Sequence, residues 1–212
     1  MEILPNIPGI EQHVFGDIYF GYFVPTVLRG RSDAFQRDIN AILSEWVLLS
    51  LNGGFDKFIE RDSDFGLKLF GTIFRELCFS KILTTHPLES ISTVWEVFWG
   101  VLADCFNSTI REDEDQVWLL RRSGCIYIMF YLYHCQSNSN ILPIPLAVET
   151  ITNCVDTCFV ISRKFSISTV LEVFIFLLRR HCIRVCLIDG LQYIPQDRTG
   201  RPMGSAINED YN

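Results

Sequence analysis

The 212-residue sequence lacks the motifs that usually mark catalysis. It has no glycine-rich phosphate loop, no His-Glu-x-x-His pattern and no Gly-x-Ser-x-Gly turn. A catalytic histidine needs an orienting partner and a cleft, and the four histidines are scattered at positions 13, 86, 134 and 181. Asp113 and Asp115 belong to an acidic run that is typical of a solvated loop. We therefore predict that the protein is not an enzyme and uses no cofactor, metal or small-molecule substrate.

A hydrophobic run long enough to cross a membrane is also missing. The most apolar stretch covers residues 126–135, whereas a membrane-spanning helix needs about 20 residues. A polar cluster and two prolines interrupt the longer uncharged stretch over residues 123–148. The N-terminus lacks the basic start and apolar run of a secretory signal. We therefore expect a protein with no membrane partner.

Lysine is scarce, with four residues in the chain, and the formal net charge is −7. Proteins that bind DNA draw much of their affinity from lysine and arginine side chains that neutralise phosphates. An acidic chain of this kind is a poor DNA binder by itself. We therefore expect any contact with DNA to be made mainly through other proteins.

Cysteine, by contrast, is frequent, with eight residues. Most of them lie in apolar helical stretches, which favours reduced, buried thiols over a disulfide framework. Two pairs, Cys154/Cys158 and Cys182/Cys186, have the i,i+4 spacing that places both thiols on one helix face. Structural zinc sites usually take closely spaced cysteines from loops. We therefore interpret both pairs as packed thiols, with a four-thiolate zinc site as the alternative.

Apolar residues make up 49% of the chain, which includes 17 phenylalanines, and the mean hydropathy is +0.22. Leftover apolar surface of this kind is usually buried against a partner. The alternative is a large phenylalanine-rich core.

The spacing of the apolar residues predicts an all-α fold, a single compact domain of about six to seven helices. We expect a compact helical scaffold over residues 32–188, with a flexible polar tail over residues 189–212. Within it, the expected helices cover residues 33–51, 55–60, 63–78, 92–106, 117–136, 146–160 and 166–186, with Ser32 and Ser166 as N-caps. No alternating pattern predicts a strand. The helix after Val117 is apolar nearly all round its second half, which is typical of a central, buried helix.

Residues 1–31 are rich in proline, glycine and aromatic residues. This composition favours an extended N-terminal arm over a helix. Its aromatic side chains have to pack on something. They pack either back on the domain or onto a partner, and the sequence favours neither.

Aromatic and basic pairs are the remaining local features. Trp95 and Trp99 are i,i+4 neighbours and suit either a core or an interface hot spot. Arg179 and Arg180, followed by Arg184, fall near the end of the last expected helix, where the helix dipole favours cations. Arginines of this kind also pair with acidic side chains of a partner or with phosphate, and we favour the structural and protein-partner interpretation.

Two short motifs carry a family resemblance. The first is the segment Phe70, Gly71, Thr72, Ile73 and Phe74. The second is the pattern formed by Arg122, Gly124, Tyr127, Leu132, Tyr133 and Gln136. Together they resemble subunit one of the small nuclear RNA-activating protein complex. The helix that contains Trp95 and the helix with Phe174, Leu178 and Arg180 are also similar to that family, so the resemblance covers about residues 35–188.

The residue types in the two motifs are suited to helix packing and to a helix end. A glycine inside a helix costs roughly 1 kcal/mol relative to alanine, so Gly71 and Gly124 indicate that another backbone approaches closely. Tyr127 and Tyr133 place hydroxyls in an apolar setting, where each needs a hydrogen-bond partner. Gln136 is suited to end its helix with side-chain hydrogen bonds.

The resemblance implies a nuclear, all-helical scaffold that binds the zinc-containing subunit and the Myb-repeat subunit of that complex. Together these subunits would recognise the proximal sequence element of small non-coding RNA genes, which RNA polymerase II or III transcribes. The aromatic arm, the acidic run 111–115 and the missing basic C-terminal region depart from the family pattern. These departures fit a divergent member with little direct DNA contact. The alternative is a cytosolic helical adaptor unrelated to transcription.

Overall fold

The computed structural model describes residues 12–61, 63–84, 91–108, 116–136, 141–187 and 189. For residues 12–31 and 91–93 it describes the backbone alone. Two compact units divide the chain: one covers residues 34–191, and the other combines residues 1–33 with residues 192–212. The acidic run 111–115 and the predicted tail after residue 189 lie outside the described residues.

Helix α1, Gln12–Leu51, corrects the expected start of the helical region. Residues 12–31, predicted to be an extended arm, are helical in the structure. Adding residues to an existing helix needs no new nucleus. Gly16, Gly21 and Pro25 therefore raise the cost of this segment without ending the helix. Residues 1–11 of the predicted arm lie outside the described residues.

In the described part of the chain, six further α-helices and one 3-10 helix follow α1, and the predicted all-α class is confirmed. Their bounds are α2 Phe55–Arg61, α3 Leu67–Glu76, η1 Phe79–Leu83, α4 Ile91–Asn107, α5 Gln116–His134, α6 Val148–Phe165 and α7 Thr169–Arg179.

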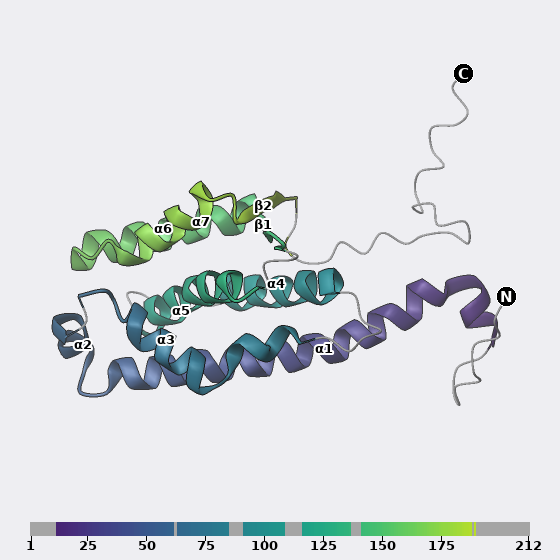
Figure 1. The fold of residues 1–212 in the computed structure, drawn as a ribbon, viewed down its shortest axis with the longest axis horizontal. Coiled ribbons are helices and arrows are strands. Elements are labelled where there is room, and N and C mark those ends of the chain that lie inside the picture. Colours follow the sequence, from purple (N-terminus) through teal and green to yellow (C-terminus); the bar gives the residue numbers. More distant parts are fainter. Residues whose placement is uncertain are drawn as a thin grey trace, which may run out of the picture. The chain divides into compact units, whose positions relative to one another are not determined.

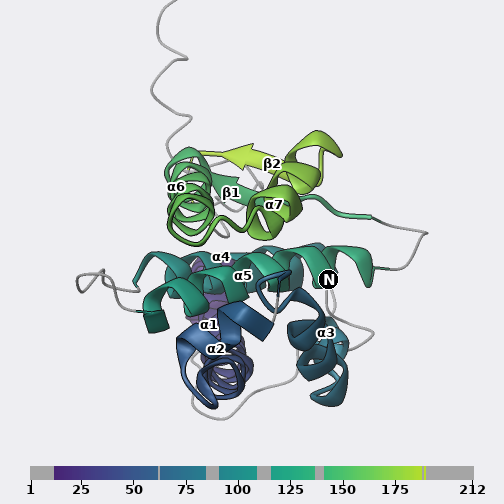
Figure 2. The same cartoon turned by 90° about the vertical axis from the view of Figure 1, so that its left-hand side faces the viewer.

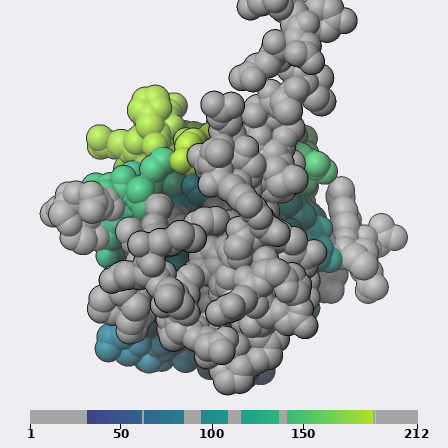
Figure 3. All heavy atoms as spheres, turned by 90° about the vertical axis from the view of Figure 1, so that its right-hand side faces the viewer, coloured from purple at the N-terminus to yellow at the C-terminus, as the bar shows by residue number. Residues whose placement is uncertain are grey.

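The unit formed by residues 34–191 has three layers (Figure 1). The C-terminal part of α1 lies with α2 and α3 in one outer layer, and α6 and α7 form the other (Figure 2). Helices α4 and α5 lie between them. On the surface, the same order runs from blue α3 and η1 to yellow-green α7 (Figure 3). This arrangement explains why α5 is buried nearly all round, from Trp118 to Leu132.

Two short strands were not expected from the sequence. Strand β1, Ile144–Ala147, pairs in parallel with β2, Ile183–Cys186, so that Ile144 lies opposite Ile183. The predicted helix 166–186 is therefore too long, because α7 ends at Arg179. Cys182 precedes β2 and Cys186 is its last residue. The two cysteines therefore do not share a helix face, although their spacing indicated that they would.

Ser166 is the second local correction. It was expected to begin a helix, but it ends α6 in the left-handed conformation, with φ 56°. The residue before α7 is Ser168. The two serines are two positions apart in the sequence. Residue type alone does not show which of them ends α6 and which precedes α7, because that depends on the backbone conformation.

Asp189, which follows β2, is hydrogen-bonded to the start of α6. Its carboxylate accepts hydrogen bonds from the backbone N–H of Ala147, at 2.6 Å, and from the hydroxyl of Thr150. Both donors lie at the N-terminus of α6, where the helix dipole favours negative charge. The folded unit therefore includes Asp189, which the sequence assigned to the tail.

In the described part of the chain, no helix is long and apolar enough to cross a membrane.

Candidate functional site

The two sequence motifs lie on different helices and pack against each other. Phe70 of α3 is fully buried, with its ring centroid 5.5 Å from that of Tyr127 of α5. Phe74 contacts the next tyrosine of the same helix, Tyr131, at 5.4 Å between ring centroids. The motifs are therefore two sides of one helix–helix contact. Tyr131 stands between motif positions Tyr127 and Tyr133 and belongs to neither motif, so no pattern in the sequence indicated its role.

Gly71 is needed at the centre of this contact. A Cβ atom at this position would lie 2.5 Å from the hydroxyl oxygen of Tyr131 and 2.8 Å from its Cζ atom. At such distances an added Cβ atom would force the Tyr131 side chain or α3 to shift, so the observed packing of α3 on α5 depends on glycine here. The close neighbour is a side chain and not the backbone that the helical glycine indicated.

The tyrosine hydroxyls hold the turn that precedes α3. Tyr127 donates to the carbonyl of Phe65 at 3.0 Å, and Tyr131 donates to the carbonyl of Leu67 at 2.9 Å. Burial raises the pKa of Tyr127 well above its usual value of 10, with a further contribution from the charge of Asp64. The hydroxyl therefore stays protonated and remains a donor. These bonds fix the turn against α5.

We expect Tyr127→Phe to lower the free energy of unfolding by about 1–3 kcal/mol, because the carbonyl of Phe65 would be left buried without this donor. Urea denaturation followed by circular dichroism measures the change. Tyr131→Phe is the matched control, since Tyr131 is only half-buried and water can replace its hydroxyl. An equal loss in both variants would contradict the role assigned to burial.

Gly124, on α5 itself, is the glycine of the second motif and faces α1. A Cβ atom there would lie 2.6 Å from Cδ2 of Leu43 and 3.0 Å from Cδ1 of Trp46, both on α1. Trp46 also donates its indole N–H to the carbonyl of Leu120 at 2.8 Å. The two motif glycines thus let α5 pack closely on α3 and α1, which lie in the same outer layer. At Gly124 the close neighbours are the side chains of Leu43 and Trp46 and not the backbone that the helical glycine indicated.

Arg122 connects α5 to the other outer layer. Its guanidinium carbon lies 4.5 Å from the ring centre of Phe106 and 4.6 Å from that of Trp118. It also donates to the hydroxyl of Thr157 on α6 at 3.2 Å. A planar cation that stacks on aromatic rings and donates at its edge suits a position between packed helices.

Gln136 follows the end of α5 and anchors the chain beyond it. Its amide donates to the carbonyls of Tyr133, at 3.3 Å, and Leu142, at 3.0 Å. Its carbonyl oxygen accepts from the N–H of Leu142 at 2.8 Å. The expected role of Gln136 in ending the helix is therefore confirmed, and the side chain also pins the entry to β1.

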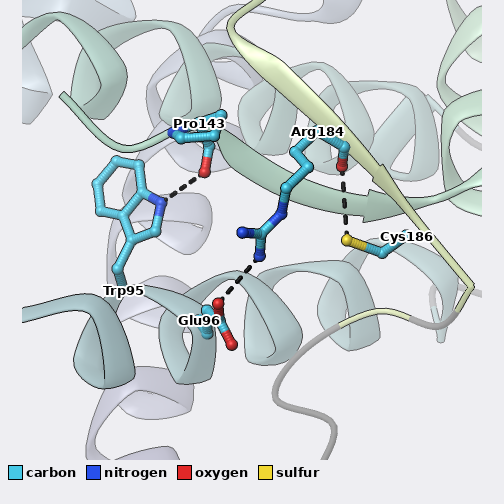
Figure 4. Close-up of polar contacts among 5 residues, drawn as sticks. All are labelled: Trp95, Glu96, Pro143, Arg184 and Cys186. Carbon is cyan, nitrogen blue, oxygen red and sulfur yellow. Dashed lines mark hydrogen bonds and ion pairs between the residues drawn. The ribbon is translucent and has the colours of Figure 1, made fainter.

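Trp95 supports the same strand from α4. Its indole N–H donates to the carbonyl of Pro143 at 2.8 Å (Figure 4). Its ring lies edge-on to that of Trp99, with 5.0 Å between ring centroids. Arg184 of β2 forms an ion pair with Glu96 at 2.9 Å, which raises the pKa of the arginine. This pair is partly exposed, so it contributes little to stability. It shows that Arg184 lies on a strand over α4 and not one helical turn after Arg180.

The other predicted site residues divide between interior and surface. Ile73 and Trp99 are buried, while Thr72 and Tyr133 are half-buried. Arg179 and Arg180, at the end of α7, are exposed, and Arg180 lies 5.7 Å from the ring centre of Phe176. Of the predicted set, these two arginines are the residues that face solvent most fully. Most of the predicted set forms the core of this chain.

The first motif also reaches a surface groove, which we call the α3–α5 groove. Its volume is about 670 Å³. The lining residues are Lys68, Gly71, Thr72, Phe74, Arg75, Cys78, Ser80, Lys81, Tyr131 and Cys135. Neither lysine nor Arg75 belongs to the predicted site. Sequence reasoning missed them because they come from two different elements, α3 and η1.

In the described part of the chain, no group of three or more potential ligands is placed to hold a metal. The cysteines described there are all free, and Cys125, Cys154 and Cys158 are buried together between α5 and α6. Burial raises the pKa of Cys158 to about 12, so its thiol stays protonated at neutral pH. Thiols in this state are poor nucleophiles and poor metal ligands.

Comparison with known proteins identifies one family. The model of "Small nuclear RNA activating complex (SNAPc), subunit 1" matches residues 35–200, which is well over half of the chain. The match contains both motifs and the α3–α5 contact between them. No curated protein and no solved structure matches the sequence.

Proposed function

This chain belongs to the family of subunit 1 of the small nuclear RNA activating complex, and from that membership we propose that it is a non-catalytic scaffold subunit of such a complex. Its task is to hold the other subunits in position at promoters of small non-coding RNA genes. The family match over residues 35–200 is the observation that carries the proposal.

The packing of the motifs supports a scaffold role. Gly71 and Gly124 seat α5 against its neighbours, and Arg122 and Gln136 connect it to the remaining elements. The motif residues thereby stabilise the three-layer arrangement itself. A rigid arrangement keeps exposed surfaces at fixed positions, which lowers the entropic cost of binding several partners.

The partners we propose are the zinc-containing subunit and the Myb-repeat subunit of the complex. Recognition of the proximal sequence element, upstream of genes read by RNA polymerase II or III, would then come mainly from those subunits. The net charge of −7 supports this division, because it opposes extensive phosphate contact by this chain. The proposed compartment is the nucleus.

Affinity purification of the tagged chain from whole-cell extract, followed by mass spectrometry, tests this function. We expect both other subunits in stoichiometric yield. Chromatin immunoprecipitation should show the chain at promoters of small non-coding RNA genes and not at a matched messenger RNA promoter. Recovery of cytosolic proteins without either subunit would favour the alternative of a helical adaptor and overturn the proposal.

A further inference from the structure

The α3–α5 groove concentrates positive charge in an acidic protein. Two of the four lysines of the chain, Lys68 and Lys81, line it together with Arg75, and no carboxylate does. All three side chains are exposed, and in the described part of the chain none of them forms an ion pair. Arg75 uses its Nε atom to donate to the carbonyl of Gly71 at 3.2 Å, so the outer nitrogens of the guanidinium remain available. The groove therefore has unneutralised positive charge.

Between these cations the groove is apolar and aromatic. The buried ring of Phe74 and the half-buried ring of Tyr131 lie 5.4 Å apart between centroids, beside the bare backbone of Gly71. A volume of about 670 Å³ fits a few side chains, as in small-ligand sites of ~300–1,000 Å³. An apolar floor with a charged rim suits a short segment that carries an apolar anchor and several carboxylates.

We propose that the α3–α5 groove binds an acidic segment of another subunit of the complex, with an aromatic or aliphatic side chain seated against Phe74 and Tyr131. This inference rests on the proposed function, because it takes its partner from the same complex. Lys68, Arg75 and Lys81 pair with the carboxylates of the segment. The motif residues Gly71, Thr72 and Phe74 then serve both the fold and the interface.

Charge complementarity separates this groove from another hollow of similar size. The other hollow, about 730 Å³, lies along the end of α1 and includes the exposed side chain of Leu48. Its one cation, Arg121, donates to the side chain of Asn40 at 2.7 Å. That hollow therefore offers no charge pattern that selects a partner. Nucleic acid is also disfavoured in the α3–α5 groove, because three cations around an apolar floor neutralise few phosphates.

Zero-length carbodiimide cross-linking of the assembled complex, followed by mass spectrometry, tests the pairing directly, because this reagent joins an amine only to a carboxylate in contact with it. We expect Lys68 and Lys81 to be linked to one acidic stretch of another subunit. Lys57 and Lys164 are exposed lysines outside the groove and serve as internal references. Links from Lys68 and Lys81 only to the chain's own residues 111–115 would overturn the proposal.

A thiol footprint gives an independent measurement. Cys78 and Cys135 both line the groove and are the two exposed cysteines of the described residues. Maleimide should modify both in the free chain, and assembly should slow the modification about tenfold or more, since a seated segment covers them. Cys186 of β2, half-buried and outside the groove, is the reference. Unchanged labelling of Cys78 and Cys135 in the intact complex would overturn the proposal.

A charge-reversal pair measures the contribution to assembly. The double variant Lys68→Glu/Lys81→Glu should bind the co-expressed subunits about tenfold more weakly or worse, with a normal melting temperature. The matched control, Lys57→Glu/Lys164→Glu, makes the same change in net charge elsewhere on the surface. If the control weakens assembly equally, general charge and not the groove is responsible. If both variants assemble normally but promoter DNA is lost only with the first, the groove binds nucleic acid.

These results distinguish failure of the inference from failure of the proposed function. If the wild-type chain does not recover the other subunits, the proposed function is wrong. If the wild-type chain assembles while the footprint, the cross-links and the charge-reversal pair show no effect at the groove, the inference alone is wrong.

Discussion

Gly66→Ala should lower the free energy of unfolding by about 2–5 kcal/mol. Gly66 precedes α3 with φ 69°, in the left-handed region that alanine adopts at a cost. An added Cβ atom would also lie 2.8 Å from Cζ3 of Trp46 and 2.9 Å from Cε2 of Phe58. Trp46 cannot move away easily, because its indole N–H is bonded to the carbonyl of Leu120. Backbone strain and overpacking therefore add at this position.

Gly54→Ala is the matched control for that variant. Gly54 also has a positive φ, 100°, but nothing lies within 4 Å of an added Cβ atom. Its cost should be backbone strain alone, about 1–2 kcal/mol. Urea denaturation of both variants separates the two contributions. Equal losses would mean that Trp46 and Phe58 make room for the methyl group, and the account of packing at this turn would be wrong.

Trp46→Ala should cost about 3–5 kcal/mol, the range for truncating a large buried aromatic side chain. Trp46 is fully buried, on the face of α1 that packs against the core. Its ring meets those of Phe58, Phe70 and Tyr127 edge-on, at 5.7, 5.5 and 6.0 Å between centroids. Loss of the ring leaves a cavity where α1, α2, α3 and α5 meet. It also removes the hydrogen bond to Leu120.

Unfolding of these variants is best followed by circular dichroism. Tryptophan fluorescence is less suitable, because the substitution removes one of the four tryptophans that contribute to it. If Trp46→Ala does not fold, Trp46→Phe keeps a ring in the cavity and loses the indole N–H. Its expected cost is smaller, about 1–3 kcal/mol. A loss below about 1 kcal/mol in Trp46→Ala would show that the four helices do not depend on this side chain.

Periodicity predicted the helices best where one face is buried. The stripe Phe70, Ile73 and Phe74 predicted α3, although the expected helix 63–78 extends beyond both ends of Leu67–Glu76. The nearly uniform apolar pattern of α5 predicted its central position. Both follow from the chain's need to remove apolar surface from water, which the order of residues shows directly. The motif glycines likewise indicated close approach before any neighbour was known.

Positions set by distant partners could not be predicted in the same way. β1 and β2 have four residues each. They form a sheet because the fold brings Ile144 opposite Ile183, although α6 and α7 separate the two strands in the sequence. Such short apolar runs have no period of their own, so the sequence placed β2 in the expected helix 166–186 and divided β1 between a loop and the expected helix 146–160. Tyr131 and the cations of the α3–α5 groove gain their importance in the same way, from elements that only the fold brings together.

The sequence by itself determined the all-α class, the central place of α5 and the family of the protein, because these depend on local pattern and motif order. The tertiary structure decided which residues the motifs contact: Gly71 meets Tyr131, and Gly124 meets Leu43 and Trp46. It also decided that most of the predicted interface residues are interior. The physical reason is that burial and close approach are properties of pairs of elements, and a single stretch of sequence contains only one member of each pair.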